Sequence, residues 1–96
     1  MDFKNRRYVT CGVNENVPLM LQLFLWQCID KLPPGKDRLQ VFKLSADDGK
    51  QKIIHIQELP EYQKEYLIRS DTPFFIGKIY AIDDETHSTM LLAEEY

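Results

Sequence analysis

The feature that most constrains the fold is a change in hydrophobic pattern at Pro33-Pro34-Gly35. Before this point no helix breaker interrupts the run from Val17 to Leu32 except Pro18, which fits a first helical turn because its missing N–H would be unpaired there. Asn14 and Asn16 precede the run as candidate caps. The sequence therefore predicts one long helix over residues 17–32 that ends abruptly at the two prolines.

After the prolines the pattern changes to short segments rich in β-branched and aromatic residues, which are typical of strands. Asp47-Asp48-Gly49 predicts a tight hairpin turn, because glycine supplies the positive φ that such a turn needs. Turns are also expected at residues 70–73 and 83–86. The last segment contains good helix formers and could be a short helix, but its place in a hairpin favours a strand. The predicted strands are residues 6–11, 38–45, 50–59, 64–69, 75–82 and 88–93.

This order of elements favours the α+β class. With 44% hydrophobic and 28% charged residues the chain has enough apolar surface to fold, and 96 residues allow a single domain over residues 1–96. Short connections between the later strands require antiparallel neighbours. We expect one N-terminal strand and one long helix, packed on an antiparallel sheet of about five to six short strands.

The cysteines and the apolar runs favour a cytoplasmic protein. Cys11 and Cys28 are too few for a disulfide scaffold, and Cys28 lies among apolar residues as a buried thiol. No apolar run of a secretory signal follows the first charged residues. The longest apolar stretch, residues 17–29, is shorter than the roughly 20 residues of a membrane span.

Three large apolar residues of the predicted helix form a stripe opposite its core side. Leu19, Leu23 and Trp26 align at helical spacing, although a single helix on a sheet should be polar there. The C-terminal segment with Leu91, Leu92 and Tyr96 could fold over the stripe, or the sheet could curl around the helix. Alternatively, the stripe stays exposed as a partner-binding site, for another protein or for a second copy in a homodimer.

The residue types that carry catalysis are present without a recognisable arrangement. His55 is expected on the outer face of the sheet, opposite Ile54 and Ile56. His87 follows an acidic turn with Asp83, so a weak metal site or a metal-dependent hydrolase built on these residues is an open alternative. The spacing matches no metal motif, and no glycine-rich phosphate loop is present. The sequence therefore predicts a protein that is not an enzyme and needs no cofactor.

The charge distribution leaves one nucleic-acid alternative open. The chain carries a net charge of −3, which weakly repels nucleic acids and anionic membranes. Its N-terminus is nevertheless basic, so a small nucleic-acid-associated regulator could use Lys4, Arg6, Arg7 and Tyr8. The leading hypothesis remains a non-catalytic protein-interaction module that binds itself or another protein.

Several segments also resemble a small family of Gram-positive bacteria and their mobile elements, domain of unknown function nine hundred and sixty. The resemblance covers nearly the whole chain and implies an intracellular accessory protein without an established activity or cofactor. The family commonly has arginine at the position of Cys11, which weakens the case for a catalytic thiol there. The segments that carry the resemblance are residues 7–14, 18–26, 39–42, 51–55, 60–62 and 88–96.

Overall fold

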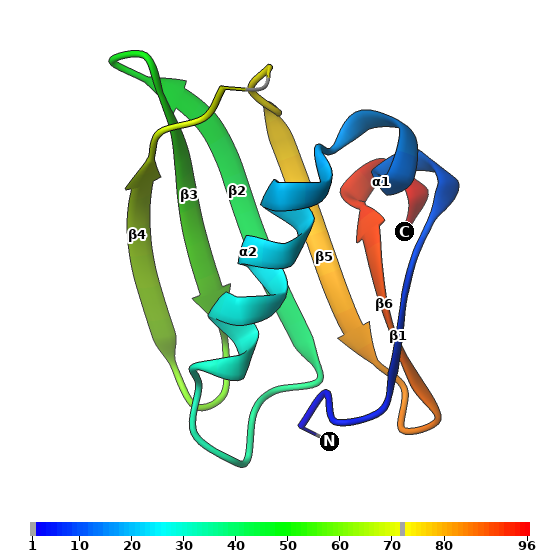
Figure 1. Ribbon diagram of the computed structural model, residues 1–96. Coiled ribbons are helices and arrows are strands. Elements are labelled where there is room, and N and C mark those ends of the chain that lie inside the picture. The colour runs from blue at the N-terminus through cyan, green and yellow to red at the C-terminus, as the bar shows by residue number, and fades with distance from the viewer. Residues whose placement is uncertain (1, 72) are drawn as a thin grey trace.

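The computed structural model describes residues 2–71 and 73–96 and has an α+β architecture, with helices packed against a six-stranded sheet (Figure 1). Residue 72 of the predicted 70–73 turn lies outside the described residues. The final segment is a strand, and a short 3-10 helix, η1, follows it. The elements are β1 (Arg6–Val9), α1 (Cys11–Asn16), α2 (Leu19–Asp30), β2 (Leu39–Asp47), β3 (Lys50–Gln57), β4 (Tyr62–Ile68), β5 (Gly77–Asp83), β6 (His87–Leu92) and η1 (Ala93–Glu95).

The strand order is β1-β6-β5-β2-β3-β4, so the first strand lies beside the last one. All pairs are antiparallel except β1 and β6, which are parallel. The expectation of a purely antiparallel sheet is therefore wrong at this edge. Short loops enforce antiparallel pairing only between strands that follow each other in sequence, and most of the chain separates β1 from β6.

The predicted long helix is only partly confirmed, because two helices occupy residues 11–30. Thr10 caps α1 by accepting a hydrogen bond from the Val13 amide at 3.3 Å, so the first strand ends earlier than predicted. Val17 is extended, with φ −113° and ψ 119°, as expected for a residue that precedes proline. Pro18 then serves as the N-cap of α2, which has 12 residues.

The β2–β3 hairpin forms at the predicted turn. Asp48 and Gly49 both have positive φ, 51° and 72°, which matches the twist of the flanking strands. In register, Asp47 pairs with Lys50 and Phe42 pairs with His55. This register fixes which side chains of β3 face the helices.

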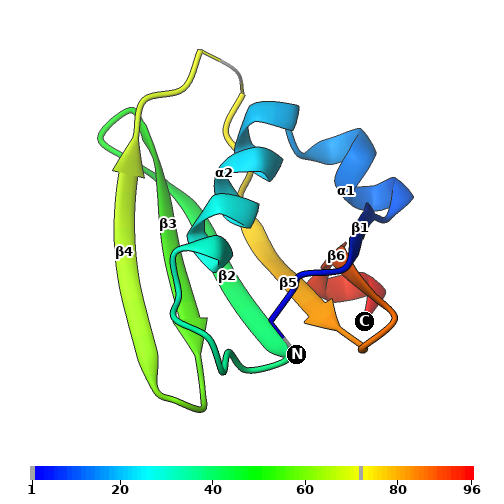
Figure 2. The ribbon, with the colours of Figure 1, turned by 60° about the horizontal axis from the view of Figure 1, so that its bottom comes forward.

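The core lies between the two helices and one face of the sheet. Figure 2 shows both α-helices on the concave side of the curved sheet, so the sheet wraps partly around α2. Cys28 is buried there as predicted, and burial raises the pKa of its thiol. The core side chains include Val13, Val17, Leu21, Leu25, Ile29, Phe42, Leu44, Ile53, Ile79, Ala81, Met90 and Leu92.

A buried carboxylate anchors the segment before β1. Asp83 accepts hydrogen bonds from the Phe3 amide and from the Asn5 side chain, both at 2.9 Å. It also accepts one from the Glu85 amide at 2.9 Å. Burial opposes ionisation of Asp83, but these three donors hold its pKa below the usual value. As a result the Phe3 side chain is held in the core.

No helix in the described parts of the chain combines the length and apolar character that crossing a bilayer requires.

Candidate functional site

The outward side of α2 is apolar and carries no charge along its first two turns. Leu19, Met20 and Leu23 are 65%, 73% and 46% exposed. No charged residue occurs between Glu15 and Asp30. Solvent-facing helix surfaces are normally covered by charged and polar residues, so this surface has the composition of an interface.

Trp26 does not belong to this exposed surface, although the sequence places it on the same stripe. Its side chain is 8% exposed and joins the core. The Arg7 guanidinium lies 4.8 Å from the centre of the Trp26 ring and forms an ion pair with Asp30. The Arg7 side chain of β1 thus covers Trp26 on the second half of α2, so only Leu19 and Leu23 of the predicted partner-binding residues remain available.

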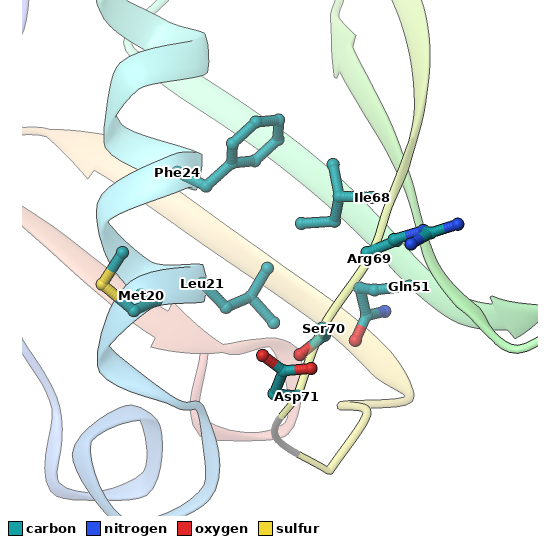
Figure 3. Close-up of a pocket in the computed structure, with 8 residues that line it drawn as sticks. All are labelled: Met20, Leu21, Phe24, Gln51, Ile68, Arg69, Ser70 and Asp71. Atoms are coloured by element: carbon teal, nitrogen blue, oxygen red, sulfur yellow. The ribbon is translucent and has the colours of Figure 1, made fainter.

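A slot of about 400 Å³ opens beside these residues, between α2 and the end of β4. Figure 3 shows Met20, Leu21 and Phe24 on the helix side and Ile68 on the opposite wall. Asp71 and Ser70 lie at one end of the slot, whereas Arg69 points away from it. The slot therefore has apolar walls and a polar end.

Gln51 fixes the loop that borders this slot. Its side-chain amide donates to the carbonyl oxygens of Ser45 and Phe75, at 2.9 and 3.0 Å, and its carbonyl oxygen accepts from the Phe75 amide at 2.9 Å. A second hollow of about 410 Å³ lies between Leu19 and Phe74. The start of α2 thus projects between two hollows, which gives a partner side chain room to insert on either side.

His55 lies in the core, so its predicted position on the outer face of the sheet is wrong. Its Nε2 is 2.6 Å from the side-chain oxygen Oε1 of Gln40, and its ring stacks on Phe42 with centroids 4.5 Å apart. Desolvation lowers its pKa to about 4, so the ring is neutral near pH 7. Side chains alternate along β3, so Ile54 and Ile56 point outward instead. Apolar residues therefore occupy both faces of this strand.

The other residues considered for metal binding or hydrolysis are not brought together. His87 Nε2 lies 3.2 Å from the Asp84 carboxylate, whereas Asp83 points inward to the N-terminal segment. His55 bonds to Gln40 in the core. Across the described residues, no three His, Cys, Asp or Glu side chains are arranged to hold a metal ion.

The basic N-terminal residues are divided between the two faces of the sheet. Lys4 and Arg6 are exposed, but Arg7 is occupied by Asp30, by Trp26 and by the Phe3 carbonyl oxygen. Tyr8 pairs its ring edge-on with His87, with centroids 5.5 Å apart. The alternation of β1 therefore breaks the predicted nucleic-acid cluster into smaller pieces.

A second apolar surface, missed in the sequence, lies on the convex side of the sheet. We call this convex side the outer sheet face. In register across four strands, Ile56 of β3 lies opposite Val41, Val41 opposite Tyr80, and Tyr80 opposite Leu91. Neither α-helix covers this side (Figure 2). The signal was the pair of adjacent isoleucines in β3, which marks a strand that is apolar on both faces.

Comparison with known proteins finds one family and one similar solved structure, and neither description names an activity. The model of a family described as "Staphylococcal protein of unknown function", DUF960, matches residues 6–95. A crystal structure of a protein of unknown function from Enterococcus faecalis is similar, with 26% sequence identity and a TM-score of 0.83. The match covers 100% of this chain and 96% of the other. No curated protein matches the sequence.

Proposed function

The chain belongs to the DUF960 family, whose description names no activity, and we propose from its geometry that it is a non-catalytic interaction module that self-associates through α2. The docking site consists of Leu19, Met20, Leu23 and the slot beside Met20, and we call it the helix docking site. The observation that carries the proposal is the exposure of these three side chains on a helix surface without charge.

The energetics favour burial of this site. Full burial of a leucine or methionine side chain is worth about 1.5–3 kcal/mol relative to full exposure. Leu19 and Met20 are the more exposed of the three, so an interface over them gains most of this amount. Part of the gain offsets the loss of translational and rotational freedom, so we expect weak to moderate association.

A second copy suits this site because its helix surface is apolar and uncharged, while Asp71 lies at one end of the slot. Leu19 and Leu23 are one helical turn apart and form a ridge that packs between the side chains of a facing helix. A two-fold dimer places the same residues on both sides of the contact, so a charged site would bring like charges together. The helix surface of the docking site avoids this repulsion even though the chain as a whole carries a net charge of −3.

The compartment is a further part of the proposal. Cys11 is exposed and Cys28 is buried, and both are free thiols. Free cysteines, one of them at the surface, are typical of a reducing environment such as the cytoplasm.

Light scattering after size-exclusion chromatography tests self-association over a hundredfold range of concentration. We expect the mass to rise from that of a monomer towards that of a dimer. Leu19→Glu combined with Leu23→Glu should keep the protein monomeric with an unchanged melting temperature. Leu59→Glu is the control, since Leu59 lies between β3 and β4 and is even more exposed than Leu19 and Leu23, so its replacement should not alter association.

A monomeric mass at every concentration contradicts self-association. Loss of folding in the single variant Leu23→Asp would place Leu23 in the core and contradict the docking site itself.

A further inference from the structure

The net charge of the outer sheet face is positive, opposite in sign to the net charge of the whole chain. Strand register places five cations on this face, and only the carboxylates of Asp47 and Glu65 accompany them. The complete chain has a net charge of −3. Positive charge is therefore gathered on the side of the sheet that the helices leave open. The five cations are Arg6, Lys43, Lys50, Lys52 and Lys78.

Two of these lysines face each other without a counterion. Lys43 and Lys78 are direct partners across β2 and β5, and both side chains are exposed. Among the described residues neither one forms an ion pair, whereas nearby Lys52 is 3.6 Å from Glu65. Like charges at directly opposite positions destabilise a sheet, so a bound anionic group would remove a repulsion present in the free protein.

An apolar surface begins immediately beside this lysine pair. Ile54 lies opposite Lys43, and a half-buried row from Ile56 through Val41 to Tyr80 follows two residues further along the strands. Leu91, the next residue in register, is already buried. Three adjacent strands at a spacing near 4.8 Å give this row a width of about 10 Å. An α-helix with its side chains has a diameter of about 10 Å, so the row is wide enough to receive one.

We propose that the outer sheet face binds an acidic amphipathic segment of a partner protein. Apolar side chains of the segment cover Val41, Ile56 and Tyr80, and carboxylates at one end reach Lys43 and Lys78. This inference is separate from self-association, because α2 and the outer sheet face lie on opposite sides of the sheet (Figure 2).

The chemistry of the face disfavours two other occupants. A second copy of the same face would bring further positive charge against Lys43 and Lys78, which raises the repulsion instead of relieving it. Sheets that bind single-stranded nucleic acids stack bases on aromatic side chains. On β2, β3 and β5 the outer sheet face presents one aromatic ring, that of Tyr80, and Tyr96 already packs edge-on against it at 5.4 Å.

The test is a titration of the ¹⁵N-labelled protein with a synthetic amphipathic helical peptide that has leucines on one face and glutamates at one end. A twin peptide with lysines in place of the glutamates is the charge control. We expect the glutamate peptide to shift the amide signals of Val41, Lys43 and Tyr80 and to bind at least tenfold more tightly than its twin. The Leu19→Glu/Leu23→Glu variant should bind it equally well.

Matched variants locate the charge effect. Lys43→Gln with Lys78→Gln should weaken binding of the glutamate peptide at least fivefold. Lys4→Gln with Lys36→Gln removes the same total charge away from the face and should change binding less than twofold. Val41→Thr keeps the shape of the side chain but adds a hydroxyl group, and should weaken binding several-fold without loss of the folded spectrum.

Four results would overturn the proposal. The first is the absence of shifts on β2 and β5 at millimolar glutamate peptide, and the second is equal binding of the lysine twin. The third is tighter binding of a twelve-nucleotide single strand at the same amides. The fourth is tighter binding of vesicles that contain phosphatidylglycerol. The last two results would identify a nucleic-acid surface and a membrane surface, respectively.

Discussion

Arg7 lies over Trp26, with its guanidinium carbon 4.8 Å from the ring centre, and thereby joins the first strand to the second half of α2. The same guanidinium donates to the Phe3 carbonyl oxygen at 3.0 Å and pairs with Asp30. One side chain therefore links the N-terminal segment, the edge of the sheet and the helix. This contact divides the predicted apolar stripe into a buried part and an exposed part.

Replacement of Arg7 with alanine should destabilise the protein by about 2 kcal/mol. A cation over an aromatic ring contributes roughly 0.5–2 kcal/mol, and a partly exposed ion pair adds at most about 1 kcal/mol. Urea unfolding measures the loss, and tryptophan fluorescence should shift to longer wavelength as Trp26 gains solvent. Asp30→Asn removes only the exposed ion pair and should cost less than half as much. Equal losses in the two variants would contradict the role of the ring contact.

Stability should fall as the pH drops from 6.5 towards 4, because of His55. Burial lowers the pKa of this histidine from 6.5 to about 4 in the folded protein, so in this window the unfolded chain binds a proton that the folded chain does not. Its contribution is complete above pH 6.5 and is lost on acidification, by roughly 3 kcal/mol in total at 1.36 kcal/mol per pKa unit. Urea unfolding at successive pH values measures this slope.

His55→Gln keeps a donor for Gln40 and should abolish most of the slope, whereas His87→Gln, at a partly exposed position, should retain it. A wild-type protein with equal stability at pH 6.5 and pH 4.5 would exclude a neutral buried histidine.

Asp83→Asn should release the segment before β1. The carboxylate accepts from the Phe3 and Glu85 amides and from Asn5, and hydrogen bonds to charged groups contribute about 1.5–3 kcal/mol each. Because an amide has one acceptor oxygen, we expect a loss of about 2 kcal/mol and faster hydrogen exchange at the Phe3 amide. Asp84→Asn, in the exposed turn, is the control and should leave exchange at Phe3 unchanged.

Because of the Asp83 carboxylate, we also expect the free energy of unfolding to fall at strongly acidic pH. Its pKa is lowered in the folded state, so its contribution is present above the usual value of 3.8 and is lost as the pH falls below it. This window lies below that of His55, so the two effects separate in a pH series. If Asp83→Asn kept the wild-type loss of stability below pH 4, the assignment to this carboxylate would be wrong.

The two thiols should differ sharply in reactivity. Cys11 is exposed and Cys28 is buried, with a raised pKa that disfavours the reactive thiolate. An aromatic disulfide reagent at pH 8 should therefore label one thiol rapidly and the second only as the protein unfolds. Cys11→Ala should remove the rapid phase, and two rapid thiols in the wild-type protein would contradict burial of Cys28.

The sequence predicted the local elements better than their arrangement. Strand positions and the hairpin at Asp48-Gly49 follow from local propensities, and these were confirmed within a few residues. The extended conformation of Val17 before Pro18 was the local signal that separates α1 from α2. The parallel pairing of β1 with β6 depends on residues some eighty positions apart, and no local pattern encodes it.

In the candidate site, too, the sequence predicted local features better than the arrangement of distant residues. Leu19 and Leu23 were identified from helical spacing, which left open whether they are buried within the chain or exposed, and in the structure both are exposed. Trp26 is buried in the core with Arg7 of the first strand over its ring, a contact between residues nineteen positions apart that helical spacing does not encode. The position of His55 could not be resolved because Ile53, Ile54 and Ile56 supply apolar residues to both faces, so periodicity alone does not identify the inner one.

The pairing of the first strand with the last has a consequence for synthesis of the protein. Among the strands that the structure describes, β1 pairs with β6 alone, so it has no strand to join until translation has passed residue 92. On the ribosome, the sheet is therefore not yet complete and cannot hold Arg7 over Trp26. That side of α2 stays open to solvent or to a chaperone. The edge of the sheet closes only after β6 has left the exit tunnel.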